Sequence, residues 1–560
     1  MKFSQMPYER PAFEELNLKL RSFLERFKNA KTLEECFAVY KEYDEYCADF
    51  GTASSLAYIR NTMDTTNEFY DKEIEYWNMT SPKLQEIFQE FTEALLNSPF
   101  RKDMENAWGS LMFNNAEIEL KTFKPEIIED LQEENNLSTE YDKLLASAQI
   151  EFDGKTLTLA ETGPYFENPD REIRKAIQEA TAKWYLSNSE QLDNIFDKLV
   201  KLRTEMAKKL GYENFVELGY YRMQRNCYDK DMVAKFRKGV EEHIVPIITE
   251  LKKEQAERIG VDTIKVYDSA FEYPDGNAKP TGTPDEIFAH AKKMYHELSD
   301  ETAKFFDFML ENELFDVLTR PGKSGGGYCS SLPKYKSPFI FANFNGTSGD
   351  IDVLTHEVGH ALASYVANDI YPSDLKSYSM ETAEIHSMSM EFFTWPWMEG
   401  FFGEQTEKYY DSHLSNALTF LPYGVMVDEF QHKIYENPDM TPTERNEYWL
   451  ELERKYRPWL DLEDTPFYEE GRRWQSQAHI YMDPFYYIDY ALAQIIAFSF
   501  WAENQKNPKP AWDKYRRLLG FAGTKTFLEL VEDAGLKTPF EPDNIKIIAD
   551  AVITWLSGRK

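Results

Sequence analysis

The sequence His-Glu-Val-Gly-His at residues 356–360 constrains this chain of 560 residues more than any other feature. Apolar residues recur at helical spacing on both sides of it, which predicts a helix in the protein core. On a helix, His356 and His360 point the same way one turn apart, so both imidazoles can reach one Zn²⁺ ion. Glu357 then lies about 100° around the helix, beside the metal and not among its ligands. The alternative is a surface helix with two solvated histidines, which the apolar flanks disfavour.

A catalytic zinc ion usually has three protein ligands and a water, so a third ligand must come from another element. Residues 380–393 read as a second helix that ends before Pro396 and returns antiparallel to the first. Spacing alone does not choose among the candidate ligands on this helix, which are Glu381, Glu384, His386 and Glu391.

The rest of the chain reads as one helix after another, which predicts a mainly α fold. We expect one helix to begin at Asn168-Pro169 and another to run from about 190 to 210, ending at Gly211. Strand signals are few: a hairpin over 150–159 that turns at Asp153-Gly154, and a strand at 338–344. We divide the chain into an N-terminal helical region with the hairpin, 1–195, and a catalytic zinc domain, 196–560.

The composition excludes several classes of protein. Asp and Glu number 97 against 63 Lys and Arg, a net charge of −34, and no basic run offers a nucleic-acid surface. The acidity indicates a soluble surface; a sharper hypothesis is an acidic cleft that attracts cationic peptides. The four cysteines have no CxxC spacing, and no signal peptide or run of about 18 apolar residues is visible. We expect a cytoplasmic protein, a monomer or small homo-oligomer, without nucleic-acid or membrane partners.

The pattern HExGHA, followed about 25 residues later by a Glu-rich helix with Ser and Met, resembles oligoendopeptidase F and its relatives in the thimet oligopeptidase family. Segments 199–212, 338–344 and 479–490 extend the resemblance over about residues 195–545. The resemblance implies that Glu384 is the third zinc ligand. Glu381 and Glu391 are then candidates for hydrogen bonds to the ligating histidines.

The resemblance also implies a fold and a substrate class. The fold is a large helical shell around a deep central substrate channel, with a small β-sheet beside the HExxH helix. Such a channel admits short unstructured peptides and excludes folded proteins. The expected activity is hydrolysis of internal peptide bonds with one Zn²⁺ ion per chain. In the implied mechanism, Glu357 takes a proton from water as it attacks the scissile carbonyl and passes it to the departing amine.

The segment His479–Tyr490 matches the part of the family that binds substrate and the oxyanion. We assign these roles to His479 and to Tyr490, with Tyr487 beside it, and Tyr486 remains an alternative. An aromatic stripe is more often part of a core, and that reading stays open for each tyrosine. The strand 339–344 precedes the metal helix; such peptidases pair an edge strand with the substrate backbone, and the alternative is an ordinary core strand. Residues 325–327 are a candidate lid.

Two other functions compete with an oligoendopeptidase. A zinc exopeptidase would need a clamp for a free carboxylate, usually an arginine, and Arg472 and Arg473 precede His479. A catalytically silent peptide-binding scaffold would have no need of Glu357. A structural zinc site usually closes its coordination with four protein ligands, which this pattern does not supply.

Overall fold

Helices dominate the computed structural model, which describes residues 1–541 and 543–558. From the N-terminus, the helices are α1 (Phe13–Lys28), α2 (Leu33–Met63), α3 (Glu68–Leu96), α4 (Arg101–Trp108), α5 (Ser110–Glu119), α6 (Ile128–Ala146), α7 (Gly163–Phe166), α8 (Arg171–Leu210), α9 (Phe215–Arg222), α10 (Lys230–His243), α11 (Val245–Ile259) and α12 (Pro284–Leu298). The remaining helices are α13 (Asp300–Glu311), α14 (Gly349–Val366), α15 (Met380–Phe393), α16 (Glu399–Phe402), α17 (Thr406–Glu436), α18 (Pro442–Tyr456), α19 (Pro466–Glu469), α20 (Ala478–Met482), α21 (Tyr487–Lys506), α22 (Pro508–Phe521), α23 (Phe527–Asp533) and α24 (Asn544–Ser557). The predicted mainly α fold is confirmed.

The described strands form three small sheets. The strands are β1 (Ile150–Phe152), β2 (Lys155–Leu157), β3 (Ile264–Lys265), β4 (Phe315–Leu318), β5 (Tyr328–Leu332), β6 (Ser337–Phe344) and β7 (Leu460–Asp461). β1 and β2 are the predicted hairpin, and its turn residues Asp153 and Gly154 have φ of 52° and 71°. Two positive φ values in a two-residue turn are typical of type I′, which explains the Asp-Gly signal.

The sheet beside the HExxH helix has the strand order β4-β6-β5. β4 pairs parallel with β6, and β5 pairs antiparallel with its other side. The strand predicted at 338–344 is β6, which is central and has both edges occupied. Of the two alternatives, a substrate-pairing edge strand and an ordinary core strand, it is the core strand. The edge beside Gly327 belongs to β5.

One correction concerns α8, which begins at Arg171 and not at Asn168-Pro169, with Asp170 as its N-cap. It continues through residues 187–190, where two helices had been expected to separate. The side chains of Ser187 and Asn188 hydrogen-bond to carbonyls one turn back, which satisfies these polar residues inside the helix. The helix ends at Gly211 in the left-handed conformation, as predicted. Residue 195 lies within α8, and a division of the chain there stays a prediction.

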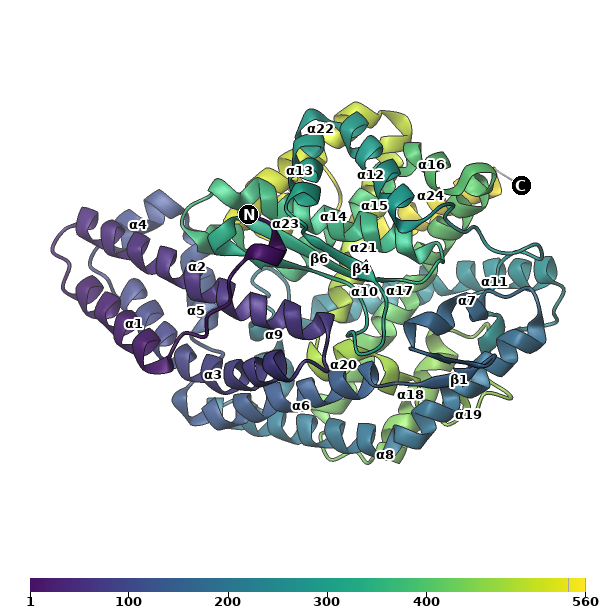
Figure 1. Cartoon of the computed structure of the whole chain (residues 1–560), viewed down its shortest axis with the longest axis horizontal. Helices are drawn as coiled ribbons and strands as arrows, with labels where there is room; N and C mark the ends of the chain where they lie inside the picture. The colour runs from purple at the N-terminus through teal and green to yellow at the C-terminus, as the bar shows by residue number, and fades with distance from the viewer. Residues whose placement is uncertain (542, 559–560) are drawn as a thin grey trace.

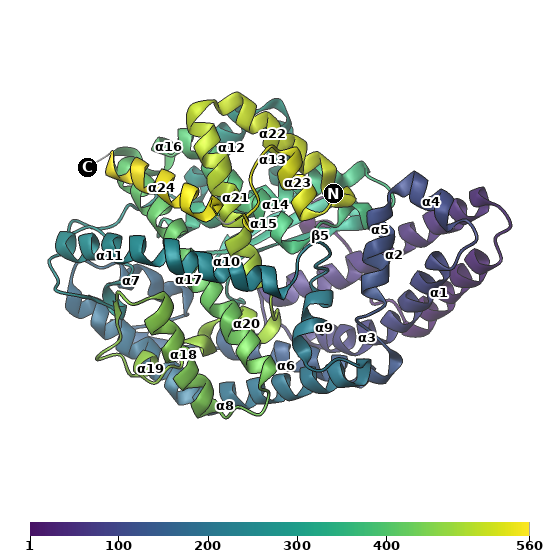
Figure 2. The same cartoon turned by 180° about the vertical axis from the view of Figure 1, so that it is seen from behind.

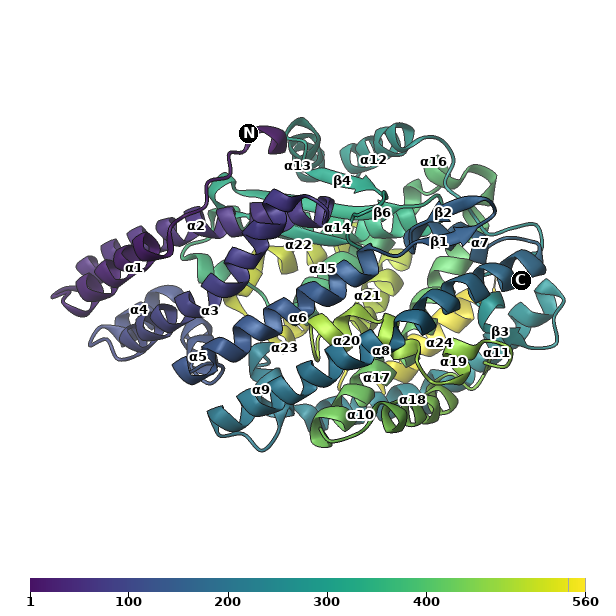
Figure 3. The same ribbon diagram turned by 60° about the horizontal axis from the view of Figure 1, so that its bottom comes forward.

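The three helices that carry the candidate site residues lie in the middle of the molecule. In Figures 1 and 2, α14, α15 and α21 lie between a layer containing α12, α13 and α22 and a layer containing α6 and α8. Figure 3 shows α6 and α8 side by side. Gly359 permits close packing of α14 on α15, because a Cβ there would lie 2.5 Å from the backbone oxygen of His386.

The N-terminal helices α1 to α5 project at one end of the molecule (Figure 1). They have an apolar core of their own, which includes Leu24, Phe27, Leu84 and Phe91. Aromatic contacts dominate it; the rings of Tyr43 and Phe91 stack with centroids 4.0 Å apart.

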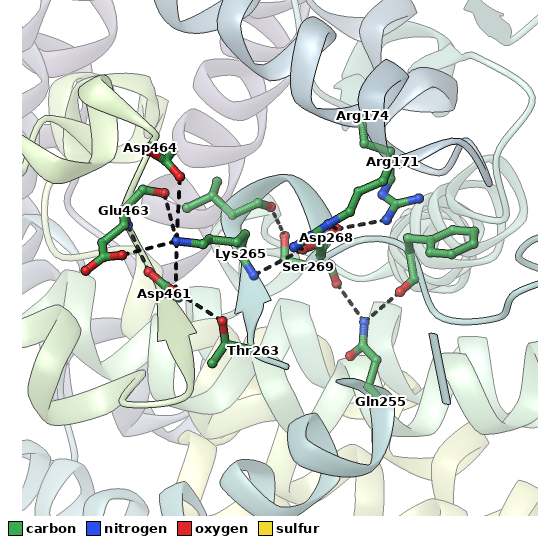
Figure 4. A network of polar contacts seen from close by, with 12 residues as sticks. Arg171, Arg174, Gln255, Thr263, Lys265, Asp268, Ser269, Asp461, Glu463 and Asp464 are labelled. Atoms are coloured by element: carbon green, nitrogen blue, oxygen red, sulfur yellow. Dashed lines mark hydrogen bonds and ion pairs between the residues drawn. The ribbon is translucent and has the colours of Figure 1, made fainter. Parts of the chain in front are cut away.

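A polar network surrounds the short β3–β7 pair (Figure 4). Lys265 makes ion pairs with Asp461 at 2.9 Å and Glu463 at 3.5 Å. Arg174 pairs with Asp268 at 2.8 Å, and both side chains are buried. The network joins the start of α8 to two loops that are far apart in the sequence. Within the described residues, no helix combines the length and apolar character that a membrane span requires.

Candidate active site

Three predicted metal ligands converge between α14 and α15. One ligand atom from each of His356, His360 and Glu384 lies within 4.8 Å of the others, and no other such group of three or more occurs in the described ranges. Glu384 Oε2 is 3.2 Å from His356 Nε2 and 3.4 Å from His360 Nε2. Tetrahedral ligands at about 2.0–2.1 Å from Zn²⁺ stand about 3.3 Å from one another. The donor set and its spacing therefore fit a zinc ion.

A relay of side chains orients His356 from behind. Its Nδ1 lies 2.7 Å from Oε1 of Glu391, and Oε2 of Glu391 lies 2.9 Å from Nε2 of His413. Trp395 Nε1 donates to His413 Nδ1 at 3.2 Å, so the proton of neutral His413 sits on Nε2 and points at Glu391. Glu391 accepts from both histidines, which leaves Nε2 of His356 with its lone pair toward the metal position.

The sequence offered Glu391 as one of two candidates for this supporting role, and the geometry favours it. Glu381 lies in the first turn of α15 and is buried; burial raises the pKa of its carboxyl, against a hydrogen bond from Ser379 and the charge of Arg225. His413 is buried and contacts Glu391. It comes from α17, and no spacing pattern connects it with the HExxH segment.

Glu357 follows the first ligand on α14, feels the charges of His356, His360 and Glu384, and is only 5% exposed. Its Oε2 has no hydrogen-bond partner among the described atoms. Burial raises the pKa of Glu357, and the charges of His356 and His360 offset part of that increase. A carboxylate with a raised pKa and an unused lone pair suits proton transfer near neutral pH. A Cβ at Gly327 would lie 3.3 Å from Glu357 Oε1, so the glycine segment passes directly beside this carboxylate.

The segment 479–490 supplies the opposite wall. The hydroxyl of Tyr486 donates to Oε1 of Glu384, and the ring of Tyr490 lies 4.9 Å from that of Tyr486. His479 Nε2 is 3.3 Å from the Tyr490 hydroxyl. Tyr487 packs against His479, with ring centroids 4.9 Å apart, and its ring also contacts Phe420 and Tyr423. The structure therefore brings His479, Tyr490 and Tyr486 to the metal ligands, and Tyr487 lies behind them.

The position of Tyr486 depends on the residue before it. Phe485 has φ of 69°, a left-handed conformation that is unusual for an aromatic residue. Gln431 accepts from its N–H at 2.8 Å, and the Arg225 guanidinium donates to its carbonyl. A Cβ at Gly219 would lie 2.5 Å from the Phe485 ring, so only glycine fits there. These contacts hold Phe485 in a strained turn next to the site, and backbone strain of this kind is typical of functional positions.

Arg225 connects this turn to α21. It pairs with Asp489 at 3.0 Å, and both side chains are fully buried. Tyr228 also donates to Asp489, at 3.1 Å. Burial raises the pKa of Asp489 to about 8, against the opposing charge of Arg225. The group fixes one turn of α21 between Tyr486 and Tyr490.

A cavity of about 380 Å³ opens beside Tyr486. Its apolar lining includes three methionines, Met223, Met380 and Met482, together with Tyr378. Methionine side chains are flexible and polarisable, so such a surface accepts apolar groups of different shapes. Met380 lies one helical turn before Glu384, which places the cavity next to the metal ligands.

Comparisons with known proteins agree with this geometry. The model of the peptidase M3 N-terminal domain matches residues 3–123, and the model of peptidase family M3 matches residues 165–549. The oligopeptidase PepF of Bacillus subtilis is 21% identical, covering 91% of this chain and 78% of its own. The oligoendopeptidase F homolog of Borreliella burgdorferi is 23% identical, covering 91% and 89%. A solved structure of PZ peptidase A with an inhibitor is 49% identical, with a TM-score of 0.98 over 100% of this chain and 99% of the other. The chain belongs to peptidase family M3.

Proposed function

We propose that this peptidase is a zinc-dependent oligoendopeptidase that hydrolyses internal bonds of short unstructured peptides. The observation that carries the proposal is the convergence of His356, His360 and Glu384 beside the buried carboxylate of Glu357. The names of its relatives, PepF and oligoendopeptidase F, support the substrate class.

Zinc would be held by His356, His360 and Glu384, one ion per chain. When bound, it supplies a Lewis acid that polarises a carbonyl and makes a water nucleophilic near neutral pH. Glu391 holds the proton on Nδ1 of His356 and so keeps the other ring nitrogen available as a ligand. Tyr486 donates to the outer oxygen of Glu384 and limits its rotation.

Glu357 moves the proton in this proposal. Its unpartnered Oε2 accepts a proton from the attacking water, and the same oxygen delivers it to the departing amine. Burial favours the protonated form between these two transfers, because the charged form is poorly solvated there.

The hydroxyl group of Tyr490, next to His479, stabilises the oxyanion of the tetrahedral intermediate, whereas the hydroxyl of Tyr486 is already bonded to Glu384. Gln477 Nε2 lies 2.9 Å from Nδ1 of His479 and donates to it, so the proton of the neutral ring is on Nε2, facing Tyr490. The Nε2–H group of His479 is thus a hydrogen-bond donor on the side of the site where the oxyanion would form.

The substrate backbone would pair with the free edge of β5, next to Gly327, and an apolar side chain would enter the methionine-lined cavity. We further propose a central channel limited to short peptides, and a cytoplasmic location. The cytoplasmic location is supported by the four cysteines, which form no disulfide.

The test is mass spectrometry of the products from a peptide of about a dozen residues, blocked at both ends, with wild type and Glu357→Gln. Internal cleavage by zinc-loaded wild type, with turnover at least about a thousandfold lower in the variant, is expected. Trimming restricted to unblocked peptides would favour an exopeptidase. Equal turnover by the variant would refute the role of Glu357.

A further inference from the structure

Two adjacent arginines before His479 have different surroundings. Arg472 pairs with Asp193 at 3.2 Å and with Glu470 at 2.7 Å. In the described part of the chain, Arg473 makes no ion pair with a carboxylate; the one hydrogen bond of its guanidinium goes from Nη1 to Ser476 Oγ at 2.6 Å. The nearby Glu453 already accepts from Arg457 and Trp449. Arg473 is thus a guanidinium with most of its five N–H groups uncommitted.

The Arg473 guanidinium lies against an aromatic surface. Its Cζ is 5.1 Å from the ring centroid of Tyr423, and Tyr487 meets the same ring edge-on at 5.8 Å. Arg473, Tyr423 and Tyr487 are each partly exposed. None of the Arg473 nitrogens is a buried atom without a partner, so the uncommitted N–H groups face accessible space. Stacking on a ring holds the planar group in a defined orientation.

A chain of hydrogen bonds places this surface on the same wall as the candidate oxyanion residues. Tyr423 donates to Gln477 Oε1 at 2.8 Å, and Gln477 Nε2 donates to His479 Nδ1 at 2.9 Å. His479 in turn is 3.3 Å from Tyr490. Arg473 therefore lies further along the wall that would receive a peptide extended past His479.

We propose that Arg473 binds a carboxylate of the substrate peptide, and that the C-terminal carboxylate is the group it takes. An unpaired, oriented guanidinium is the side chain best suited to a carboxylate, which it can bind with two parallel hydrogen bonds. In a chain with net charge −34, a guanidinium that makes no ion pair within the described residues stands out as a position for a ligand's charge. The inference rests on the proposed peptidase function and gives it a preference for short peptides with a free C-terminus.

The test compares Arg473→Gln with Arg472→Gln as the matched control. Three N-acetylated peptides of one sequence are used: a free acid, a C-terminal amide, and an amide with one Glu near the C-terminus. Dissociation constants are measured in the Glu357→Gln background, and KM and kcat in the active enzyme. Arg473→Gln is expected to weaken binding of the free acid about tenfold or more and to raise its KM, with kcat and the amide little changed. Arg472→Gln should behave as the parent.

The three peptides distinguish the source of the carboxylate. A loss confined to the Glu-bearing amide would assign Arg473 to acidic side chains and overturn the assignment to the C-terminus. Equal weakening of all three peptides, or of none, would overturn the proposal as a whole. Arg473→Lys retains the charge and should recover part of the preference if the variant is folded, as thermal melting will show. Wild type that cleaves no peptide would refute the proposed function, whereas cleavage without a free-acid preference refutes this inference alone.

Discussion

The N-terminal helices and the helices around the metal position are stabilised in different ways. The core of α1 to α5 consists of apolar side chains such as Leu24, Phe27 and Phe91. The contacts of α14, α15 and α21 instead enclose charged groups, including Glu384, Arg225 and Asp489. Apolar packing tolerates many changes at moderate cost. A buried ion pair costs little when both partners remain and much when one is removed. Substitutions in the core of α1 to α5 should therefore lower stability without lowering activity. Substitutions among the charged groups of α14, α15 and α21 should lower both.

The largest effect is expected at the metal ligands. Glu384→Ala should lose zinc on dialysis and reduce kcat/KM by at least about a thousandfold, because two histidines alone do not complete a catalytic site. Metal analysis and peptide assays measure both quantities. Glu381→Gln is the control from the same helix and should retain zinc. If Glu381→Gln lost more zinc than Glu384→Ala, the third ligand would be wrongly assigned.

A matched pair of core variants tests the comparison directly. Arg225→Gln leaves Asp489 without its partner and releases the Phe485 carbonyl, and it should cost about 3–5 kcal/mol in the free energy of unfolding. It should also reduce kcat, because Tyr486 follows Phe485. Phe91→Ala should cost a similar 3–5 kcal/mol by leaving a cavity in the N-terminal core, with kcat per folded molecule unchanged. Urea denaturation and active-site-normalised assays decide; a parallel fall of kcat in Phe91→Ala would contradict the separation of the two regions.

Acid stability should depend on Glu134, which lies between Arg203 and Arg222. Although burial raises it, the charges of Arg222 and Arg203 lower the pKa of Glu134 to about 2. A lowered folded-state pKa contributes stability above the ordinary value near 4.5, and that contribution, about 3 kcal/mol, disappears as pH falls from 4.5 toward 2. Unfolding measured from pH 7 to pH 3 should show a shallower acid loss in Glu134→Gln. An unchanged slope would exclude Glu134 as a source of the acid sensitivity.

The smallest effect is expected at the β1–β2 hairpin, outside both regions. Gly154→Ala meets no atom within 4 Å, so its cost is the strain of φ at 71°, about 1–2 kcal/mol. Thermal melting should detect a small decrease, and peptide cleavage should stay at the wild-type rate. A loss of activity would connect the hairpin with the site.

The elements with strong local patterns could be predicted from the sequence. The second helix was expected at 380–393 and is found there as α15, and the hairpin turn lies at the Asp-Gly pair. Contacts between distant segments could not be predicted. His413 reaches Glu391 from α17 because of the packing of three helices, which leaves no periodic trace in the sequence.

The tyrosines illustrate a second limit. A helix started at Pro484 would fix the directions of Tyr486, Tyr487 and Tyr490 by helical phase. Phe485 instead takes a left-handed conformation and α21 begins at Tyr487, so Tyr486 leaves that phase and turns to Glu384. A single residue with positive φ, imposed by tertiary contacts with Gly219 and Arg225, changes which side chain meets the metal position.

The close approach of α14 and α15 at Gly359 has a consequence for metal binding. Two of the ligands are on α14 and the third is on α15. The distance between these helices therefore sets the distances between the nitrogen donors and the oxygen donor. Because residue 359 has no Cβ, the two helices can lie close enough for all three donors to reach one small ion. A side chain of any length at that position would push the backbone of His386 outward and widen the space between the nitrogen and oxygen donors. Ligands at about 2.0–2.1 Å from one Zn²⁺ ion would then be harder to bring together, so such a variant should bind zinc more weakly.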